Sequence, residues 1–147
     1  MPLINFGYGD LCGLLGEKIP RETLMERIPM LGADMHSGDT GDDAMSVEFF
    51  PDRPDLFCVE GIARALRPFL GIGRPASYEV RESDVSFIID DSVLDVRPQA
   101  LCAVVKGVDI DDGVLKSIMD MQEKLHVTVG RKRSKLAIGI HDLSTVE

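Results

Sequence analysis

Apolar residues in the first third of the chain recur at the spacing of an α-helix. They lie three and four positions apart and predict two helices, over residues 10–15 and 20–31. Gly16 and Gly32 are suited to end these helices, because glycine readily adopts the left-handed conformation found at helix C-termini. A short strand over residues 3–6 is expected before them, so the chain is predicted to begin as strand, helix, helix.

The clearest helix of the chain follows a second predicted strand, residues 47–50, and the sequence PDRPD. Six apolar residues fall on one face of this helix, at Leu56, Val59, Ile62, Ala63, Leu66 and Leu70. Asp52 or Asp55 is expected to cap its start. Gly61 lies inside the helix at a cost of about 1 kcal/mol relative to alanine, which predicts that another backbone segment passes close to it.

A break in the pattern divides the chain into two predicted domains. Gly71, Gly73 and Pro75 interrupt the helix and favour a loop. We therefore expect one domain over residues 1–75 and the first part of another over residues 76–147.

The second domain is predicted to be a sheet with one covering helix. Its β-branched and aromatic content predicts strands over residues 77–80, 85–90, 101–108 and 136–140. Asp111 or Asp112 is expected to cap the helix between the third and fourth strands. No covering element follows the last strand, so this domain is predicted to be incomplete. The predicted fold class is α+β, a small winged-helix-like module followed by the start of a mixed α/β domain.

Composition excludes several classes of protein. No apolar run approaches the roughly 18 residues of a membrane helix, and the first residues have neither the basic flank nor the apolar core of a secretory signal. The three cysteines are far apart and form no Cys-x-x-Cys pair, which argues against a zinc site. Free thiols in a reducing cytosol are the expected state, and the predicted location is cytoplasmic.

Charge limits any role in nucleic-acid binding to one short segment. The net charge is −9, so the chain as a whole repels phosphates. Four cations nevertheless occur within five residues, at Arg131, Lys132, Arg133 and Lys135. A solvated turn is the preferred interpretation of this segment, and contact with tRNA phosphates is the alternative.

Two long motifs give the sequence a family resemblance. Residues 47–70, VEFFPDRPDLFCVEGIARALRPFL, resemble the β subunit of archaeal-type phenylalanine–tRNA ligases, with Asp52 and Cys58 where the family usually has Asn and Ser. Residues 122–143, QEKLHVTVGRKRSKLAIGIHDL, resemble the archaeal and eukaryotic form of that subunit. Bacterial relatives carry an inserted domain where this chain has only the short stretch SGDTGDD, residues 37–43.

The resemblance implies a role within a larger enzyme. The family forms an α₂β₂ tetramer in which the α subunit uses ATP and Mg²⁺ to attach phenylalanine to tRNA(Phe), and the β subunit carries an editing pocket. Residues 1–75 would be a structural module and residues 76–147 the first part of the editing-type domain. The implied partners are the α subunit, the rest of the β subunit and, in the full complex, tRNA(Phe), with no membrane. The chain itself is expected to be inactive and to bind no cofactor.

No catalytic set can be assembled from the sequence, and other candidates have simpler interpretations. Glu60 and Arg64 are spaced as a helix ion pair. His126 is placed to interact as a cation with a helix C-terminus. His141 and Asp142 would point to opposite faces of a strand, which is poor geometry for catalysis. Local pairing is also expected for Arg53 with its neighbouring aspartates. The alternative functions are an editing hydrolase acting alone on mischarged tRNA and a stand-alone nucleic-acid binder.

Overall fold

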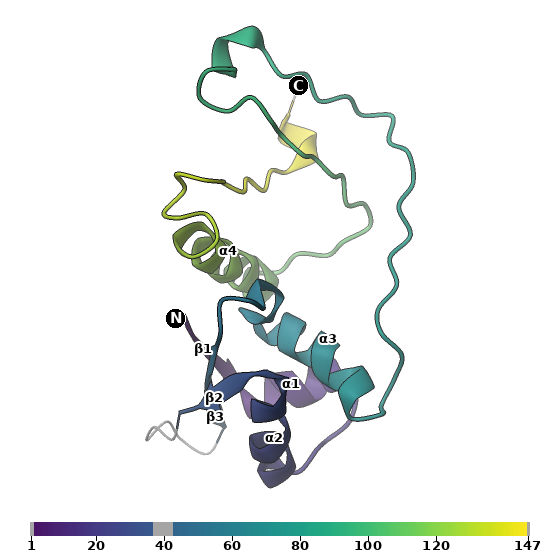
Figure 1. Cartoon of the computed structure of the whole chain (residues 1–147). Coiled ribbons are helices and arrows are strands. Elements are labelled where there is room, and N and C mark those ends of the chain that lie inside the picture. Colours follow the sequence, from purple (N-terminus) through teal and green to yellow (C-terminus); the bar gives the residue numbers. More distant parts are fainter. Residues whose placement is uncertain (1, 37–42, 147) are drawn as a thin grey trace.

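The computed structural model describes residues 2–36 and 43–146 and has an α+β fold, as the sequence predicts (Figure 1). Its strands and α-helices within those residues are β1 (Leu3–Gly7), α1 (Tyr8–Leu15), α2 (Arg21–Arg27), β2 (Ala33–Met35), β3 (Ala44–Phe49), α3 (Val59–Phe69) and α4 (Asp112–Val127). Short 3₁₀ turns lie at Pro29–Leu31, Pro54–Leu56, Asp91–Val93 and Leu143–Thr145. No helix in this described part is both long and apolar enough to cross a bilayer.

The sheet is antiparallel, with strand order β1–β3–β2. Val47 on the central strand pairs with Ile4 of β1, and Phe49 pairs with Ala33 of β2. Helices α1, α2 and α3 pack beside this sheet (Figure 1). Their shared core consists of Ile4, Leu11, Leu15, Leu24, Ile28, Ala33, Met45, Val47, Phe49, Leu56, Phe57, Ile62, Ala63 and Leu66. The first 70 residues thus bury a contiguous apolar core of their own.

The predicted helix ends are confirmed in the first half, with one helix shorter than expected. Gly16 and Gly32 adopt left-handed conformations, with φ of 84° and 89°. Helix α2 ends at Arg27, because Pro29 has no N–H to continue the helical hydrogen bonds and the chain tightens into a 3₁₀ turn. Strand β2 was not predicted, since it is three residues long and is defined by its pairing with β3. Residues 37–42 of the predicted polar turn lie outside the described residues.

The start of α3 differs from the prediction in its cap. The helix begins at Val59, and Leu56 belongs to the preceding 3₁₀ turn. Its N-cap is Cys58, whose Sγ accepts a hydrogen bond from the Gly61 amide at 3.4 Å, so neither predicted aspartate caps it. The inference about Gly61 is confirmed, because a Cβ atom there would lie 1.9 Å from the carbonyl oxygen of Asp55.

None of the four strands predicted in the second half forms within described residues 76–146. An isolated strand leaves its backbone N–H and C=O groups without partners, and these segments run as separate extended lengths rather than beside one another (Figure 1). Their apolar side chains remain exposed, as at Val80, Ile88 and Leu101, with exposures of 93%, 86% and 103%. The predicted helix is confirmed as α4, and Asp111 caps it by accepting from the Val114 amide at 2.8 Å.

Helix α4 is attached to the first half of the chain. Leu125 packs against the core cluster, and the Ser117 hydroxyl donates a hydrogen bond to the Glu60 carboxylate of α3 at 2.7 Å. In Figure 1 the helix lies beside the turn that leads into α3. These two contacts join α4 to the core and to α3. The domain boundary after residue 75 stays a prediction.

Candidate phosphate-binding turn and the network that holds it

The basic segment forms a tight turn directly after α4. Gly130 begins it, and its amide donates to the Leu125 carbonyl at 2.8 Å. The Lys135 amide returns a hydrogen bond to the Gly130 carbonyl at 2.9 Å, which closes the turn. A Cβ atom at position 130 would lie 2.7 Å from the His126 carbonyl oxygen. Glycine is therefore required here by the close approach of the backbone to the end of α4.

Three successive residues of this turn have left-handed backbones. Arg131, Lys132 and Arg133 have φ of 48°, 56° and 66°, a conformation that costs a non-glycine residue about 1–2 kcal/mol. Hydrogen bonds offset this cost. The Arg133 amide donates to the His126 carbonyl at 3.1 Å, and the Arg97 guanidinium donates to the carbonyls of Arg133 and Ser134. Arg97 was not predicted to contact this turn, because nothing in its local sequence indicates an interaction with residues more than 30 positions away.

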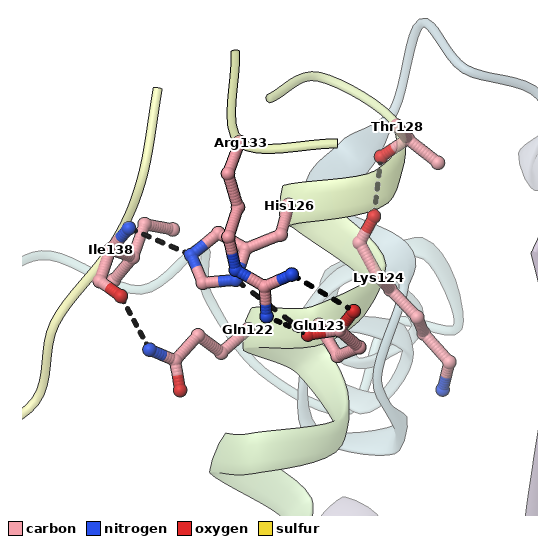
Figure 2. A network of polar contacts seen from close by, with 7 residues as sticks. All are labelled: Gln122, Glu123, Lys124, His126, Thr128, Arg133 and Ile138. Atoms are coloured by element: carbon pink, nitrogen blue, oxygen red, sulfur yellow. Dashed lines mark hydrogen bonds and ion pairs between the residues drawn. The ribbon is translucent and has the colours of Figure 1, made fainter. Parts of the chain in front are cut away.

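The structure divides the four predicted cations into two kinds. Arg133 forms an ion pair with Glu123 of α4, and its guanidinium points toward that carboxylate in Figure 2. Arg131, Lys132 and Lys135 are exposed, and no ion pair is formed by them within residues 2–36 and 43–146. The turn therefore presents three cations to solvent and uses the fourth to hold its own shape.

The buried side chain of His126 holds the segment that follows the turn. His126 is 4% exposed, and its Nε2 accepts a hydrogen bond from the Ile138 amide at 2.8 Å (Figure 2). An amide N–H only donates, so Nε2 carries no proton in this arrangement. The predicted cationic interaction of His126 with the helix end is thus replaced by a neutral ring that fixes the chain after the turn. The side-chain amide of Gln122 also donates a hydrogen bond to the Ile138 carbonyl, so Ile138 is held to α4 at both its amide and its carbonyl.

The other nitrogen of this ring has no hydrogen-bond partner among the described residues. His126 Nδ1 is buried, and the nearest Glu123 carboxylate oxygen lies 3.7 Å away. That distance is too long for a hydrogen bond. Glu123 is engaged by Arg133 instead.

The adjacent His141 and Asp142 are not arranged as a catalytic pair. The Asp142 carboxylate accepts hydrogen bonds from the hydroxyl and the amide of Ser144, at 2.8 and 2.9 Å, and these bonds lower the pKa of Asp142. It serves as the cap of a 3₁₀ turn. No group of three or more His, Cys, Asp or Glu side chains suited to a metal ion occurs in the part of the chain that the structure describes.

A second charged network lies at the start of α3. Arg53 makes two hydrogen bonds of 2.9 Å to the Asp55 carboxylate, which confirms the expected local pairing, and Arg64 adds a third of 2.9 Å. The predicted Glu60–Arg64 pair does not form. The Glu60 carboxylate instead accepts a hydrogen bond from the Ser117 hydroxyl of α4, and Arg64 forms an ion pair with Asp55. Tertiary contacts therefore replace the expected pair within the helix.

The Asp55 carboxylate is expected to stabilise the fold above pH 4 and to lose this contribution at lower pH. The Arg53 guanidinium lowers the pKa of the Asp55 carboxyl from its ordinary value of 3.8. A lowered folded-state pKa means that the contribution to stability is present above pH 4 and is lost as the pH falls through the folded pKa. Asp55→Asn should therefore be less stable than wild type at pH 6, by less than about 1 kcal/mol because the pair is partly exposed. The difference should shrink at pH 2.5.

Urea unfolding at both pH values measures this difference. Asp52→Asn, at the exposed neighbouring carboxyl, is the control and should change stability little at either pH. A gap between Asp55→Asn and wild type that is as large at pH 2.5 as at pH 6 would contradict the assignment of the effect to the carboxylate charge.

The sequence and the backbone both match known proteins over the whole chain. The β subunit of phenylalanine–tRNA ligase from Methanosphaera stadtmanae is 44% identical over 149 residues, covering 100% of this chain and 26% of that protein. The same subunit from Archaeoglobus fulgidus is 47% identical, covering 99% of this chain and 26% of the relative. The chain thus spans about a quarter of the length of the curated relatives it matches. No family model matches it.

A solved structure extends the likeness to three dimensions. It is the crystal structure of an N-terminal fragment of the phenylalanyl-tRNA synthetase β-subunit from Pyrococcus horikoshii, with a TM-score of 0.85 and 30% identity. The match covers 99% of this chain and 43% of that one, so it includes the extended segments after residue 75.

These similarities place the chain among the subunits of aminoacyl-tRNA ligases. Within that class it belongs to the family of archaeal phenylalanine–tRNA ligase β subunits, in agreement with the two sequence motifs. The motif at residues 47–70 forms β3, its following turn and α3, and the motif at residues 122–143 forms the end of α4 and the basic turn.

Proposed function

We propose that this chain is a non-catalytic, structural portion of the β subunit. It supports assembly of the whole α₂β₂ enzyme, and through that assembly the aminoacylation of tRNA(Phe) and editing. Its protein partners are the α subunit and the rest of the β subunit. ATP and Mg²⁺ act in the whole enzyme, and the chain itself contributes no catalytic residue.

The observation that carries this proposal is the unequal burial of the two halves. The core cluster is formed by side chains from residues 4 to 66, with Leu125 packed against it. Residues 76–146 instead expose many large apolar side chains, among them Val105 at 71% and Val96 at 74%. Exposed apolar surface of this extent is typical of an interaction site. Its burial against a partner would contribute roughly 25 cal/mol per Å².

The local chemistry favours a structural role over hydrolysis. A shallow, open hollow of about 570 Å³ beside α1 is lined by Tyr8, Gly9, Cys12, Gly13, Gly16, Glu17, Lys18 and Asp43. The Tyr8 hydroxyl in it already donates to the Ile19 carbonyl at 2.7 Å. A hydrolase needs a nucleophile or a bound water beside a base and an orienting group, and the described lining residues of this hollow supply no such arrangement.

Association with the remaining subunits tests the proposal. The chain is mixed with the α subunit and a β-subunit fragment that lacks the corresponding region, and the mixture is analysed by size-exclusion chromatography. We expect the chain to elute with the complex. Val80→Asp with Leu101→Asp should reduce co-elution at least tenfold, because both side chains belong to the exposed apolar surface.

Met30→Asp is the matched control, since Met30 is 62% exposed but lies on the half of the chain that has its own core. It should leave co-elution unchanged. Absence of any complex with the wild-type chain would contradict the proposed function, and so would release of tyrosine from Tyr-tRNA(Phe) by this chain alone.

A further inference from the structure

We propose that Arg131, Lys132 and Lys135 form a contact for the phosphate backbone of RNA, and that Arg133 is the positioning residue that holds them in place. The inference rests on the proposed function and deepens it, because it assigns the tRNA backbone as the partner of this turn. In the sequence alone the four cations are equivalent. The structure assigns them different roles.

Local charge favours an anion at the turn despite the negative charge of the whole chain. The carboxylate nearest to the turn on α4, Glu123, is already neutralised by Arg133, and Asp120 one turn earlier is paired with Lys124. The three remaining cations are therefore not opposed by these two carboxylates. Charges farther away than about 8–10 Å are largely screened at physiological ionic strength. A phosphate at the turn would meet three cations that neither Glu123 nor Asp120 neutralises.

Backbone geometry makes the turn a fixed platform. Three left-handed residues in a row are conformationally unfavourable, and such strain tends to persist where it serves a function. Here it is maintained by Arg97, by the Arg133 amide on the His126 carbonyl and by the closing bond of Lys135. The side chains accordingly project from a backbone that is already ordered. The cost of association therefore includes no ordering of the backbone of the turn.

A purely structural explanation makes different predictions. The turn follows the C-terminus of α4, where cations are stabilised by the helix dipole. If the three cations serve only that purpose, their removal lowers the melting temperature and leaves RNA binding unchanged. If they contact an acidic segment of a protein partner, their removal weakens assembly with the α subunit and the rest of the β subunit instead.

The test compares two triple variants of equal net charge. One combines R131Q, K132Q and K135Q, and the control combines K18Q, R74Q and K116Q, which neutralises three exposed cations elsewhere. Binding of an unmodified tRNA(Phe) transcript is measured from 50 to 300 mM KCl. At 100 mM KCl the turn variant should bind at least tenfold more weakly than wild type, and the control less than threefold. The slope of log K against log [KCl] should fall by about 2–3 in the turn variant, because each lost phosphate contact contributes roughly 0.7–0.9.

Two single variants separate the effect of charge on RNA binding from an effect on the stability of the fold. K132G removes one cation and provides glycine at a φ of 56°, so it should weaken RNA binding without lowering the melting temperature. E123Q removes the partner of Arg133 and also deletes a negative charge beside the turn. If Arg133 holds the three cations in place, E123Q should weaken RNA binding despite the added positive charge, whereas an effect of net charge alone would tighten it.

The inference is overturned if the two triple variants weaken RNA binding equally, or if the turn variant binds like wild type. The positioning role of Arg133 is overturned if E123Q tightens RNA binding or leaves it unchanged, and the Lys132 contact is overturned if K132G alters only the melting temperature. The same variants are assayed for co-elution with the α subunit and the β-subunit remainder. If the turn variant co-elutes normally and binds RNA like wild type, only the phosphate contact is refuted. If it binds RNA normally but no longer co-elutes, the turn belongs to a protein interface.

Discussion

Gly61→Ala is expected to lower the free energy of unfolding by about 3 kcal/mol. The new methyl group would lie 1.9 Å from the Asp55 carbonyl oxygen and 3.0 Å from its carbon. Both atoms are backbone, so the turn before α3 has to move away from the helix, and such overpacking typically costs 1–3 kcal/mol or more. Helix propensity alone would favour alanine by about 1 kcal/mol. A loss of stability in urea unfolding is therefore direct evidence for the close approach.

Gly13→Ala provides the matched comparison for this prediction. Gly13 also lies inside a helix, α1, and an added Cβ atom there meets nothing within 4 Å. This substitution should raise the free energy of unfolding by about 0.5–1 kcal/mol, as expected from intrinsic helix propensity. If both variants are stabilised alike, the backbone contact at Gly61 does not exist in solution.

Phe49→Ala should cost about 3–5 kcal/mol, the range for truncating a fully buried phenylalanine. Phe49 ends the central strand β3, is 0% exposed and packs within the core cluster. Its removal loses apolar burial and leaves a cavity that the three surrounding helices fill only in part. Thermal or urea unfolding of the purified chain measures the loss.

The adjacent residue gives a control with the same chemistry. Phe50 is 46% exposed, and Phe50→Ala should cost less than about 1.5 kcal/mol. A larger loss at Phe50 than at Phe49 would mean that β3 is shifted by one residue, since a one-residue slip exchanges the two faces of a strand.

The first half of the fold could be predicted because its signals are local. Helical spacing, the left-handed glycines at positions 16 and 32, and the interior Gly61 each reflect an interaction within a few residues in sequence. The features that were missed depend on tertiary contacts. Strand β2 is defined by its pairing with β3, and Cys58 rather than an aspartate caps α3 because the turn directs Asp55 toward two arginines.

In the second half, the pattern of residues alone was not sufficient to predict the secondary structure. Its β-branched segments have the composition of strands, yet the strand state requires a neighbour, and none of the four segments pairs with another in the described residues. Helix α4 was predicted correctly because a helix satisfies its own backbone hydrogen bonds.

The position of the basic turn was predicted from the sequence, but the contacts that hold it were not. Four clustered cations are visible in the sequence. The choice of Arg133 as the partner of Glu123, and the contribution of Arg97, come from contacts at sequence separations of 10 and 36–37 residues. No local pattern encodes those contacts.

The docking of α4 on α3 has an entropic consequence for the segment between them. Leu125 of α4 packs against the core cluster, and the Ser117 hydroxyl of α4 is hydrogen-bonded to Glu60 of α3. Residues 71–111 therefore form a loop that is anchored at both ends. The entropy of closing that loop is lost when this chain folds. A partner that pairs with the exposed extended segments meets a chain whose ends are already fixed, and less of its binding energy is spent on ordering. The attachment of α4 to the first half thus lowers the entropy cost of ordering the unpaired segments when a partner binds them.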